Sequence, residues 1–376
     1  MPMTIFSLDV RRARKGDCMI LHYGSKSNPR LIMIDGGPDS VYKPHLKPRL
    51  QQIKQARVAT GELEQNDSLP VDMLMISHVD DDHLKGILEM TKEEIVAKDA
   101  HKPRLVNVLD FWHNSFNELI NHTPDELTAA FSGHFGVAAA GGATMSDELI
   151  LEVEEESDDD PVIIQSGLSV IASIPQGFQL RRDAKKLGYP LNVEFDGNLI
   201  LADEDTEAID FGDGLQLTVI GPMKAELKKL HEDHIKWLKA LRDAGKSPPA
   251  ALAAYVDRSV ANLSSIVVLV EVGTKSILLT GDARGDKIIE GMEMLDLFDA
   301  DGTIKIDVMK GPHHGSDNNV DNDFFERIIA DHYVFSGNGE HGNPERGTFE
   351  MLFAARGTEP FTVHLTYPID EIDAAR

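Results

Sequence analysis

The sequence predicts an α/β protein. Short apolar runs such as Leu31–Ile34 and Val71–Ile76 are bounded by Gly, Asp or basic turns, as buried strands are. Segments with a helical pattern, such as Tyr42–Ala59, alternate with these runs. Several strands end in loops rich in His, Asp and Gly, and α/β proteins place their chemistry at such strand ends.

The remaining elements follow in order along the chain. Near the N-terminus we expect two more strands, over Ile5–Val10 and Cys18–Tyr23. In the C-terminal third the expected strands are Leu215–Ile220, Ser265–Val272, Ser276–Thr280, Ile304–Met309, His332–Ser336 and Phe361–Thr366. The expected helices there are Lys224–Ala244, Asp286–Leu297, Asp323–Ala330 and Glu345–Ala355.

Composition indicates an ordinary globular protein. With 376 residues, 41% of them hydrophobic and 27% charged, the chain can bury a large core, and we expect a single domain over residues 1–376. Cys18 is the only cysteine, which excludes an internal disulfide and a thiolate zinc cluster and favours a reducing compartment, the cytoplasm. No signal sequence and no apolar run of about 18 residues is present, so we expect no membrane span.

The formal charge of −26 disfavours a surface that is broadly coated by nucleic acid. A nucleic-acid substrate would therefore need a local basic strip. Two clusters are candidates, although each is more simply explained by the acidic residues beside it: Arg11, Arg12, Arg14 and Lys15, and Arg181, Arg182, Lys185 and Lys186.

The middle of the chain, residues 100–213, has weaker patterns and is expected to be an insertion. It contains an acidic run at residues 152–160, which is typical of an exposed or mobile loop. Because long insertions in compact domains are usually functional or disordered, this segment would suit a lid or a protein partner.

The most informative motif is the hexapeptide His78-Val79-Asp80-Asp81-Asp82-His83, directly after the apolar run that ends at Ile76. Its alternating spacing can turn several imidazoles and carboxylates toward one point, as a divalent metal site requires. The competing interpretation is a solvated acidic loop that happens to contain two histidines.

Two further strand ends carry possible ligands. Asp282 follows the strand that ends at Thr280, and a carboxylate there can bridge two metal ions. Taken alone, Gly281-Asp282 would be an ordinary turn. His313 and His314 follow another buried strand in a tight loop, and we expect one of the pair to be a ligand.

In this order the motifs resemble the metallo-β-lactamase fold hydrolases, and more narrowly the hydrolase domain of ComEC-type DNA-uptake proteins and their stand-alone relatives. The resemblance covers both flanking thirds of the chain and implies a four-layer αββα sandwich with an inserted middle segment. The matching pieces are Gly16–Leu21, Leu31–Gly37, Ser77–Gly86, Asn262–Val270, Leu278–Asp282, Asp307–Ser316 and His341–Pro344.

The resemblance also implies a site with two divalent ions. His78 and Asp80 would hold one ion, and Asp82 and His83 the other. Asp282 would bridge them, while Asp35 would orient a ligand from behind. The other implied features are His313 or His314 as the last ligand of the second ion and Asp81 pointing away from the site.

Two departures from the broad superfamily shift the expected metal. Asp80 stands where a histidine is usual, and no histidine occurs in the segment 260–264. Both changes also occur in the ComEC-type branch, and they shift the preference from Zn²⁺ toward Mn²⁺ or Mg²⁺. The expected cofactor is two divalent ions, Mn²⁺ or Zn²⁺ with Mg²⁺ as a further candidate, and a single bound ion is the alternative. His231 and His234 could replace the missing ligand, although a solvated helix face explains them better.

The resulting hypothesis is a phosphodiesterase or nuclease that uses a metal-activated hydroxide, with Asp82 in the reacting centre. Ser316 and the backbone at Gly315 could bind a phosphate oxygen, and His341 could protonate the leaving oxygen or be an ordinary loop histidine. The charge favours a small nucleotide over long duplex DNA. A lactam, thioester or lactone hydrolase and a partner-binding module with little turnover are the alternatives.

Overall fold

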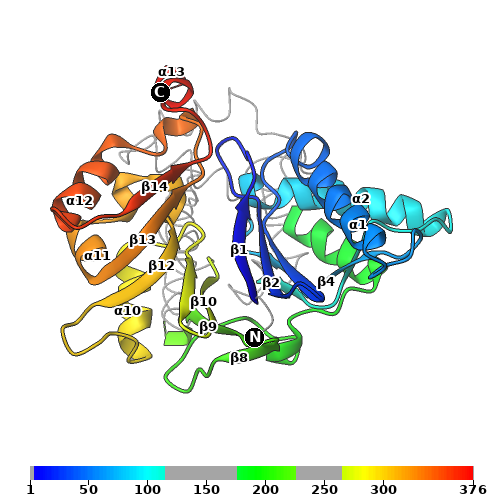
Figure 1. Cartoon of the computed structure of the whole chain (residues 1–376), viewed down its shortest axis with the longest axis horizontal. Coiled ribbons are helices and arrows are strands. Elements are labelled where there is room, and N and C mark those ends of the chain that lie inside the picture. Colours follow the sequence, from blue (N-terminus) through cyan, green and yellow to red (C-terminus); the bar gives the residue numbers. More distant parts are fainter. Residues whose placement is uncertain (1–3, 115–175, 226–264, 376) are drawn as a thin grey trace, which may run out of the picture.

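The computed structural model describes residues 4–114, 176–225 and 265–375 (Figure 1). Strands and helices are mixed along these residues, so the predicted α/β class is confirmed. Within the described residues the strands form sheets of five, seven and two strands. No helix in this part of the chain is long and apolar enough to cross a membrane.

The five-stranded sheet has the order β1-β2-β3-β5-β7. β1 to β3 pair antiparallel, whereas β3, β5 and β7 pair parallel, so the latter three end at the same edge of the sheet. The bounds are β1 Thr4–Val10, β2 Met19–Ser25, β3 Asn28–Ile34, β5 Met73–Ile76 and β7 Phe111–His113.

The seven-stranded sheet has the order β14-β13-β12-β11-β10-β9-β8. β8 to β11 pair antiparallel and β11 to β14 pair parallel. The bounds are β8 Ile209–Gly212, β9 Leu215–Gly221, β10 Val267–Val272, β11 Lys275–Leu279, β12 Ile304–Lys310, β13 Ile328–Phe335 and β14 Thr362–Leu365.

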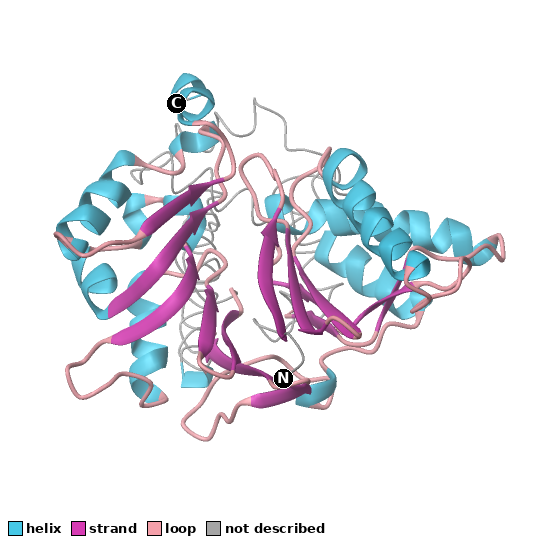
Figure 2. Cartoon of the chain, in the orientation of Figure 1, coloured by secondary structure: helices cyan, strands magenta, loops and turns pink. Residues whose placement is uncertain are grey.

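The two sheets face each other, and helices cover their outer faces (Figures 1 and 2). α1 (Lys47–Ala59) and α2 (Asp81–Asp99) pack on the five-stranded sheet. The seven-stranded sheet is covered by α10 (Gly285–Met294), α11 (Asn322–Arg327) and α12 (Arg346–Arg356). The layers therefore run helices, sheet, sheet, helices.

This layering explains why the strands are apolar on both faces. In β3, Ile32 and Ile34 enter the core between the sheets, while Leu31 and Met33 enter the core under the helices. Successive side chains of a strand point to opposite faces, so a strand covered on both sides must be apolar at nearly every position. β10 follows the same rule, with Val268 facing the other sheet and Leu269 facing the helices.

The smaller elements connect these layers. The two-stranded sheet pairs β4 (Leu69–Val71) with β6 (Val106–Val108). A C-terminal helix, α13 (Ile369–Ala375), was not predicted. Residues 176–187 are also helical. The short helical turns are Tyr42–Leu46, Val193–Phe195, Pro312–Gly315, Asp317–Asn319 and Glu340–Gly342.

Two predicted elements differ from the structure. The strand expected over Val71–Ile76 is divided at Asp72, whose carboxylate pairs with Arg30 at 2.9 Å, because β4 and β5 join different sheets. The helix expected over Asp323–Ala330 ends at Arg327. Strand β13 begins at the next residue because it pairs with β12 from Ile328 onward.

Several predictions lie wholly or mainly outside the described residues. These are the acidic run at 152–160, the helix over Lys224–Ala244 with its two histidines, and the segment 260–264. Within the described part of residues 100–213, β7 pairs with β5, and Leu191 forms an isolated bridge to Phe111.

Candidate metal centre

The ends of strands from both sheets meet where the two sheets approach each other. β5 leads into His78 through Ser77, and β11 leads into Asp282 through Thr280 and Gly281. β12 leads into the loop with His313 and His314. We call the seven side chains that these loops and the start of α2 bring together the candidate metal centre: His78, Asp80, Asp82, His83, Asp282, His313 and His314.

The hexapeptide at residues 78–83 is a loop followed by the first turn of a helix. Asp80 precedes α2 with extended backbone angles, and Asp81 and Asp82 occupy its first turn. Carboxylates are favourable there because the N-terminal end of a helix carries partial positive charge. Asp81 pairs with Lys85 one turn further along α2, so it engages the helix surface, whereas His83 is completely buried.

Asp35 fixes the histidines of this loop from behind. Its carboxylate accepts hydrogen bonds from the Ser77 amide at 2.8 Å and the Ser77 hydroxyl at 2.7 Å, and lies 2.9 Å from Nδ1 of His83. Because an ionised carboxylate only accepts, Nδ1 of His83 is the donor. The Ser77 oxygen, whose proton is committed to Asp35, can accept from Nδ1 of His78 at 3.0 Å.

Asp17 and Ser336 support His314 in the same way. The Ser336 hydroxyl donates to Asp17, which leaves its oxygen to accept from Nδ1 of His314 at 3.0 Å. Asp17 is itself paired with the fully buried ammonium of Lys310 at 2.7 Å. His313 is anchored differently, through Nδ1 to the Asn319 side-chain oxygen at 2.9 Å.

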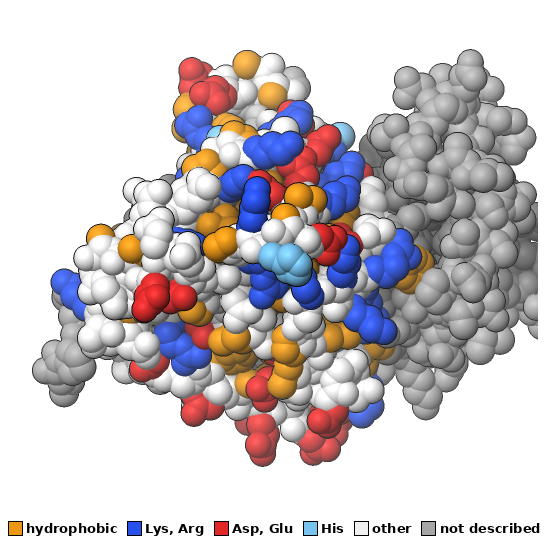
Figure 3. Space-filling view, turned by 90° about the vertical axis from the view of Figure 1, so that its right-hand side faces the viewer, with side chains coloured by type: hydrophobic (Ala, Val, Ile, Leu, Met, Phe, Trp, Pro, Cys, Tyr) orange, Lys and Arg blue, Asp and Glu red, His pale blue; other side chains and the backbone are white. Residues whose placement is uncertain are grey.

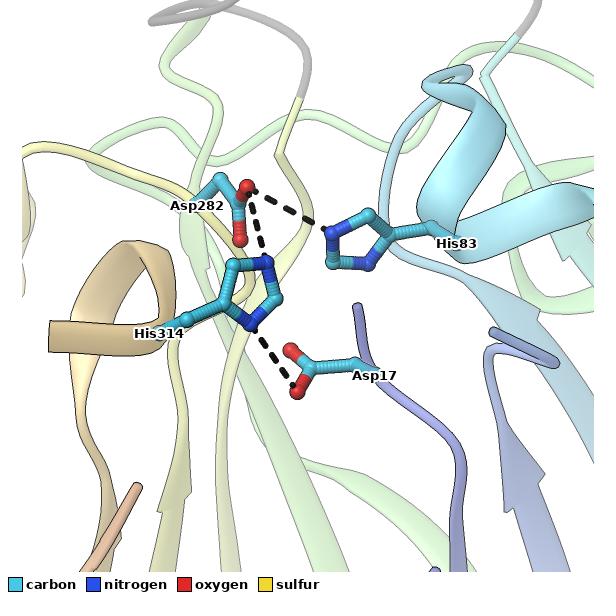
Figure 4. A group of neighbouring side chains, drawn as sticks. All are labelled: Asp17, His83, Asp282 and His314. Atoms are coloured by element: carbon cyan, nitrogen blue, oxygen red, sulfur yellow. Dashed lines mark ion pairs between the residues drawn. The ribbon is translucent and has the colours of Figure 1, made fainter. Parts of the chain in front are cut away.

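All four histidines therefore present Nε2 to the Asp282 carboxylate. The distances from Asp282 Oδ2 to these nitrogens are 3.4 Å for His83, 3.4 Å for His314, 3.6 Å for His313 and 3.7 Å for His78. In Figure 4, dashed lines join the Asp282 carboxylate to the His83 ring on its right and to the His314 ring below it. Only His313 is substantially exposed, with 40% of its side chain accessible.

The other two carboxylates lie beside different histidines of this group. Asp80 Oδ2 is 3.5 Å from Nε2 of His78, and Asp82 Oδ2 is 3.9 Å from Nε2 of His314. Gly16 packs against Asp82, because a Cβ at Gly16 would lie 1.8 Å from the Asp82 carbonyl oxygen. The loop before β2 thus closes over this side of the centre.

Asp17 lies close to the candidate metal centre, but it contacts the nitrogen of His314 that points away from Asp282. Ligand atoms of Asp17, His83, Asp282 and His314 lie within 4.8 Å of one another (Figure 4). However, Asp17 lies at Nδ1 of His314, whereas Asp282 lies at Nε2. Because the two nitrogens point in different directions, Asp17 orients His314 and is not a ligand beside Asp282.

The electrostatics couple these groups strongly. Burial favours the neutral forms, but the carboxylates of Asp282 and Asp17 outweigh it at His314 and raise its pKa to about 9. At His83 burial is likewise outweighed by Asp282 and Asp35, so its pKa lies well above the usual value. Conversely, the histidines hold the pKa of Asp282 well below its usual range despite burial.

The donor set fits divalent ions. Nε2 of His78, His83 and His314 and one oxygen each of Asp80 and Asp282 are buried without a hydrogen-bond partner among the described residues. Buried polar atoms are normally satisfied, so a convergent group of unpartnered ones needs an explanation. Imidazole nitrogen with carboxylate oxygen is a donor set for borderline or hard divalent cations.

Ser316 and Gly315, the residues predicted to bind a phosphate oxygen, contact their own loop and the start of α12. The Ser316 amide donates to the His313 carbonyl at 3.0 Å, and its hydroxyl lies 3.5 Å from a Glu345 oxygen. The Gly315 carbonyl accepts from the Glu345 amide at 2.8 Å and the Thr348 hydroxyl at 2.7 Å.

His341 and Lys15 lie in contact with each other near Asp82. Nε2 of His341 lies 3.0 Å from the Lys15 ammonium. Burial and then Lys15 lower the pKa of His341, while Asp82 raises it, so the ring is within electrostatic reach of the centre. His341 has a left-handed backbone, with φ of 60°.

Sequence reasoning missed the supporting residues Asp17, Lys310, Ser336 and Lys15 as parts of the site. One signal was available for Lys310. It ends an apolar strand, and a buried lysine needs a carboxylate partner. Nothing in the local pattern identified Asp17 as that partner.

No family model and no curated protein matches this chain. A crystal structure described as "Putative metal-dependent hydrolase" from Parabacteroides distasonis is similar at 9% sequence identity and a TM-score of 0.33, over 96% of this chain and 98% of that chain. A mutant of CmlA beta-hydroxylase is similar at 10% identity and a TM-score of 0.37, over 97% of this chain and 53% of that chain. At TM-scores below 0.5 these likenesses assign neither family nor activity.

Proposed function

We propose that this chain is a metal-dependent hydrolase of the metallo-β-lactamase fold, related to the ComEC-type branch, and that it cleaves phosphodiester bonds. One observation carries the proposal. Four histidines, each anchored through Nδ1, present Nε2 within 3.7 Å of one carboxylate oxygen of Asp282. A purely structural cluster would not need four imidazole rings that all turn Nε2 toward the same carboxylate.

Two ions would divide this donor set. His78 and Asp80 would hold the first, with His313 as the ligand that replaces the histidine absent from residues 260–264. The second ion would be held by Asp82, His83 and His314, with Asp282 shared. Asp35 and Asp17 would orient the ligands.

The balance of donors suits manganese or zinc, with magnesium possible. Three aspartates supply oxygen, which favours a harder cation than a site made only of histidines would. Divalent ions in such a site activate water and neutralise charge on the oxygens of a phosphodiester. Asp80 stands where related hydrolases usually have a histidine, and this is the reason for preferring a phosphodiester substrate over a lactam.

Lys15 and His341, on the Asp82 side of the centre, would contact the substrate directly. Lys15 would bind a phosphate oxygen through its ammonium. His341, whose lowered pKa keeps it largely neutral near pH 7, can hydrogen-bond to the leaving oxygen and hold a proton there. Both groups face the Asp82 side of the centre.

The test uses purified full-length protein, stripped of metal and reloaded with Mn²⁺ or Zn²⁺. We expect turnover of bis-p-nitrophenyl phosphate and of single-stranded or duplex DNA, but not of a β-lactam. Asp82→Ala should abolish the metal-dependent rate, whereas Asp39→Ala, on the exposed loop after β3, should not. Turnover of the lactam alone, or no turnover by a protein that binds no metal, would overturn the proposal.

A further inference from the structure

Basic side chains gather on one face of this acidic protein. Figure 3 shows one such group of Lys and Arg side chains around a histidine, on the side where α1 and α2 lie, with acidic side chains interspersed. Further cations lie in the loop after β1 and in the turn and helix start at residues 42–47. We call six of them the basic strip: Arg11, Arg12, Arg14, Lys15, Lys43 and Lys47.

One end of the strip lies at the candidate metal centre. The Lys15 ammonium contacts His341 at 3.0 Å, and the next residue, Gly16, packs on the Asp82 carbonyl. The Lys15 ammonium is therefore near the place where a reacting phosphate would lie. Lys15 therefore belongs to the surroundings of the candidate metal centre, whereas the other five cations of the strip do not.

The strip continues from Lys15 toward α1. The Arg12 guanidinium lies over the Tyr367 ring, 5.2 Å from its centroid, and the Tyr367 hydroxyl accepts from the Arg14 amide at 2.8 Å. His45 lies next to the strip, since after burial the charges of Arg11 and Arg12 lower its pKa. The turn that carries His45 also carries Lys43.

Neighbouring carboxylates neutralise only part of this charge. Asp9 pairs with Arg11, Glu340 with Arg14 and Glu93 with Lys47. Asp39 is a further acid near Arg14. Arg12, Lys15 and Lys43 form no ion pair with a carboxylate among the described residues, so the strip keeps an excess of positive charge in a chain of net charge −26.

We infer that the basic strip binds the phosphates that flank the scissile bond of a single-stranded polynucleotide. The inference rests on the proposed phosphodiester hydrolysis and specifies its substrate. A mononucleotide would need only the Lys15 end, and a strip that leads away from the centre is explained by a longer anion. The Tyr367 ring with Arg12 upon it offers a surface on which a base can stack, as in single-strand-binding grooves.

The test compares two double variants of equal net charge. Arg12→Gln/Lys43→Gln removes two cations of the strip, and Lys102→Gln/Lys305→Gln removes two exposed cations elsewhere. Binding of a 12-residue fluorescein-labelled oligothymidylate is followed by fluorescence anisotropy in EDTA, so that no hydrolysis occurs. Measurements between 50 and 200 mM salt give the slope of log affinity against log salt.

We expect the strip variant to lose about tenfold or more in affinity. Its salt slope should fall by about 1.4, or about 0.7 for each phosphate that the strip no longer neutralises. The control variant should stay within about twofold of the wild type. The single variant Lys43→Gln, which leaves the Arg12–Tyr367 pair intact, should show about half the change in slope. Equal weakening in both double variants, or no oligonucleotide binding by the wild type, would overturn the inference.

The two proposals fail in distinguishable ways. A metal-loaded wild type that cleaves bis-p-nitrophenyl phosphate but does not bind the oligonucleotide would refute the strip and leave the proposed function standing. Oligonucleotide binding that depends on the strip, without cleavage of any phosphodiester, would refute the proposed function and leave the strip as a binding site. Thymidine monophosphate should compete weakly with the oligonucleotide, and competition at equal affinity would also count against the strip.

Discussion

The Oδ2 atom of Asp35 lies 2.9 Å from Nδ1 of His83, and this contact decides which nitrogen of the ring faces Asp282. The carboxylate accepts from three donors at once, two of them on Ser77. An asparagine offers one acceptor oxygen and one donor group in its place, so at least one of these donors would meet another donor.

Asp35→Asn should therefore weaken metal binding by about 10- to 100-fold, because the His83 ring loses its orientation. Asparagine tolerates the left-handed backbone at this position, where φ is 55°, so the chain should still fold. The measurement is a manganese titration by isothermal calorimetry. Asp39→Asn, on the exposed end of the same loop, is the matched control, and equal affinity of the two variants would argue against an orienting role for Asp35.

Asp282 should be required for both metal ions, since it is the carboxylate that all four histidines face. Asp282→Asn should reduce bound manganese, measured by mass spectrometry of the gel-filtered protein, to near zero. Asp80→Asn should remove only the ion on the His78 side. If Asp282→Asn keeps as much metal as Asp80→Asn, Asp282 does not bridge.

Much of the candidate metal centre could be predicted because its ligands follow apolar strands directly in the sequence. His78, Asp282 and His314 each stand within five residues after such a strand, where the chain leaves the core. The sequence also contains a signal for the start of α2 at Asp81, because Asp80, Asp81 and Asp82 are residues that favour a helix N-terminus.

The support for His314 could not be predicted in the same way. Asp17 and Ser336 are 319 residues apart, and neither stands in a pattern that names the other. Their contact depends on how the loop after β1 packs against the end of β13, which is a property of the tertiary fold. The same is true of Lys15 and His341, 326 residues apart.

Metal binding should release protons. In the metal-free protein the pKa of His314 is about 9, so at pH 7.5 its ring is protonated on both nitrogens, and the pKa of His83 also lies well above its usual value. A metal ion needs an unprotonated Nε2, and binding at pH 7.5 should therefore release protons, among them the one on His314. As the pH rises through about 9, His314 loses its proton beforehand and the number released should fall.

Calorimetry of Mn²⁺ binding in buffers of different ionisation enthalpy measures this number. His332→Gln, on β13 and in contact with His364 instead of the centre, is the control and should leave the count unchanged. A count near zero at pH 7.5 would show that the two rings are neutral before the metal arrives.

Lys310 and Asp17 form a buried ion pair, and removing either partner alone should strongly destabilise the protein. Both side chains have no exposed surface and lie 2.7 Å apart. Burial raises the pKa of Asp17, but Lys310 and His314 outweigh it and hold that pKa below its usual range. A carboxyl with a lowered folded pKa stabilises the protein above its unfolded pKa, near 4, and this stabilisation is lost as the pH falls further.

Lys310→Met should therefore cost about 3–5 kcal/mol in the free energy of unfolding at pH 7, because it leaves the Asp17 charge buried and unpaired. The double variant Asp17→Asn/Lys310→Met removes that charge as well and should recover part of the stability. Urea unfolding of the metal-free protein measures all of these values. A decrease of less than about 1 kcal/mol in Lys310→Met would mean that water or a rearranged side chain reaches Asp17 and replaces the ammonium.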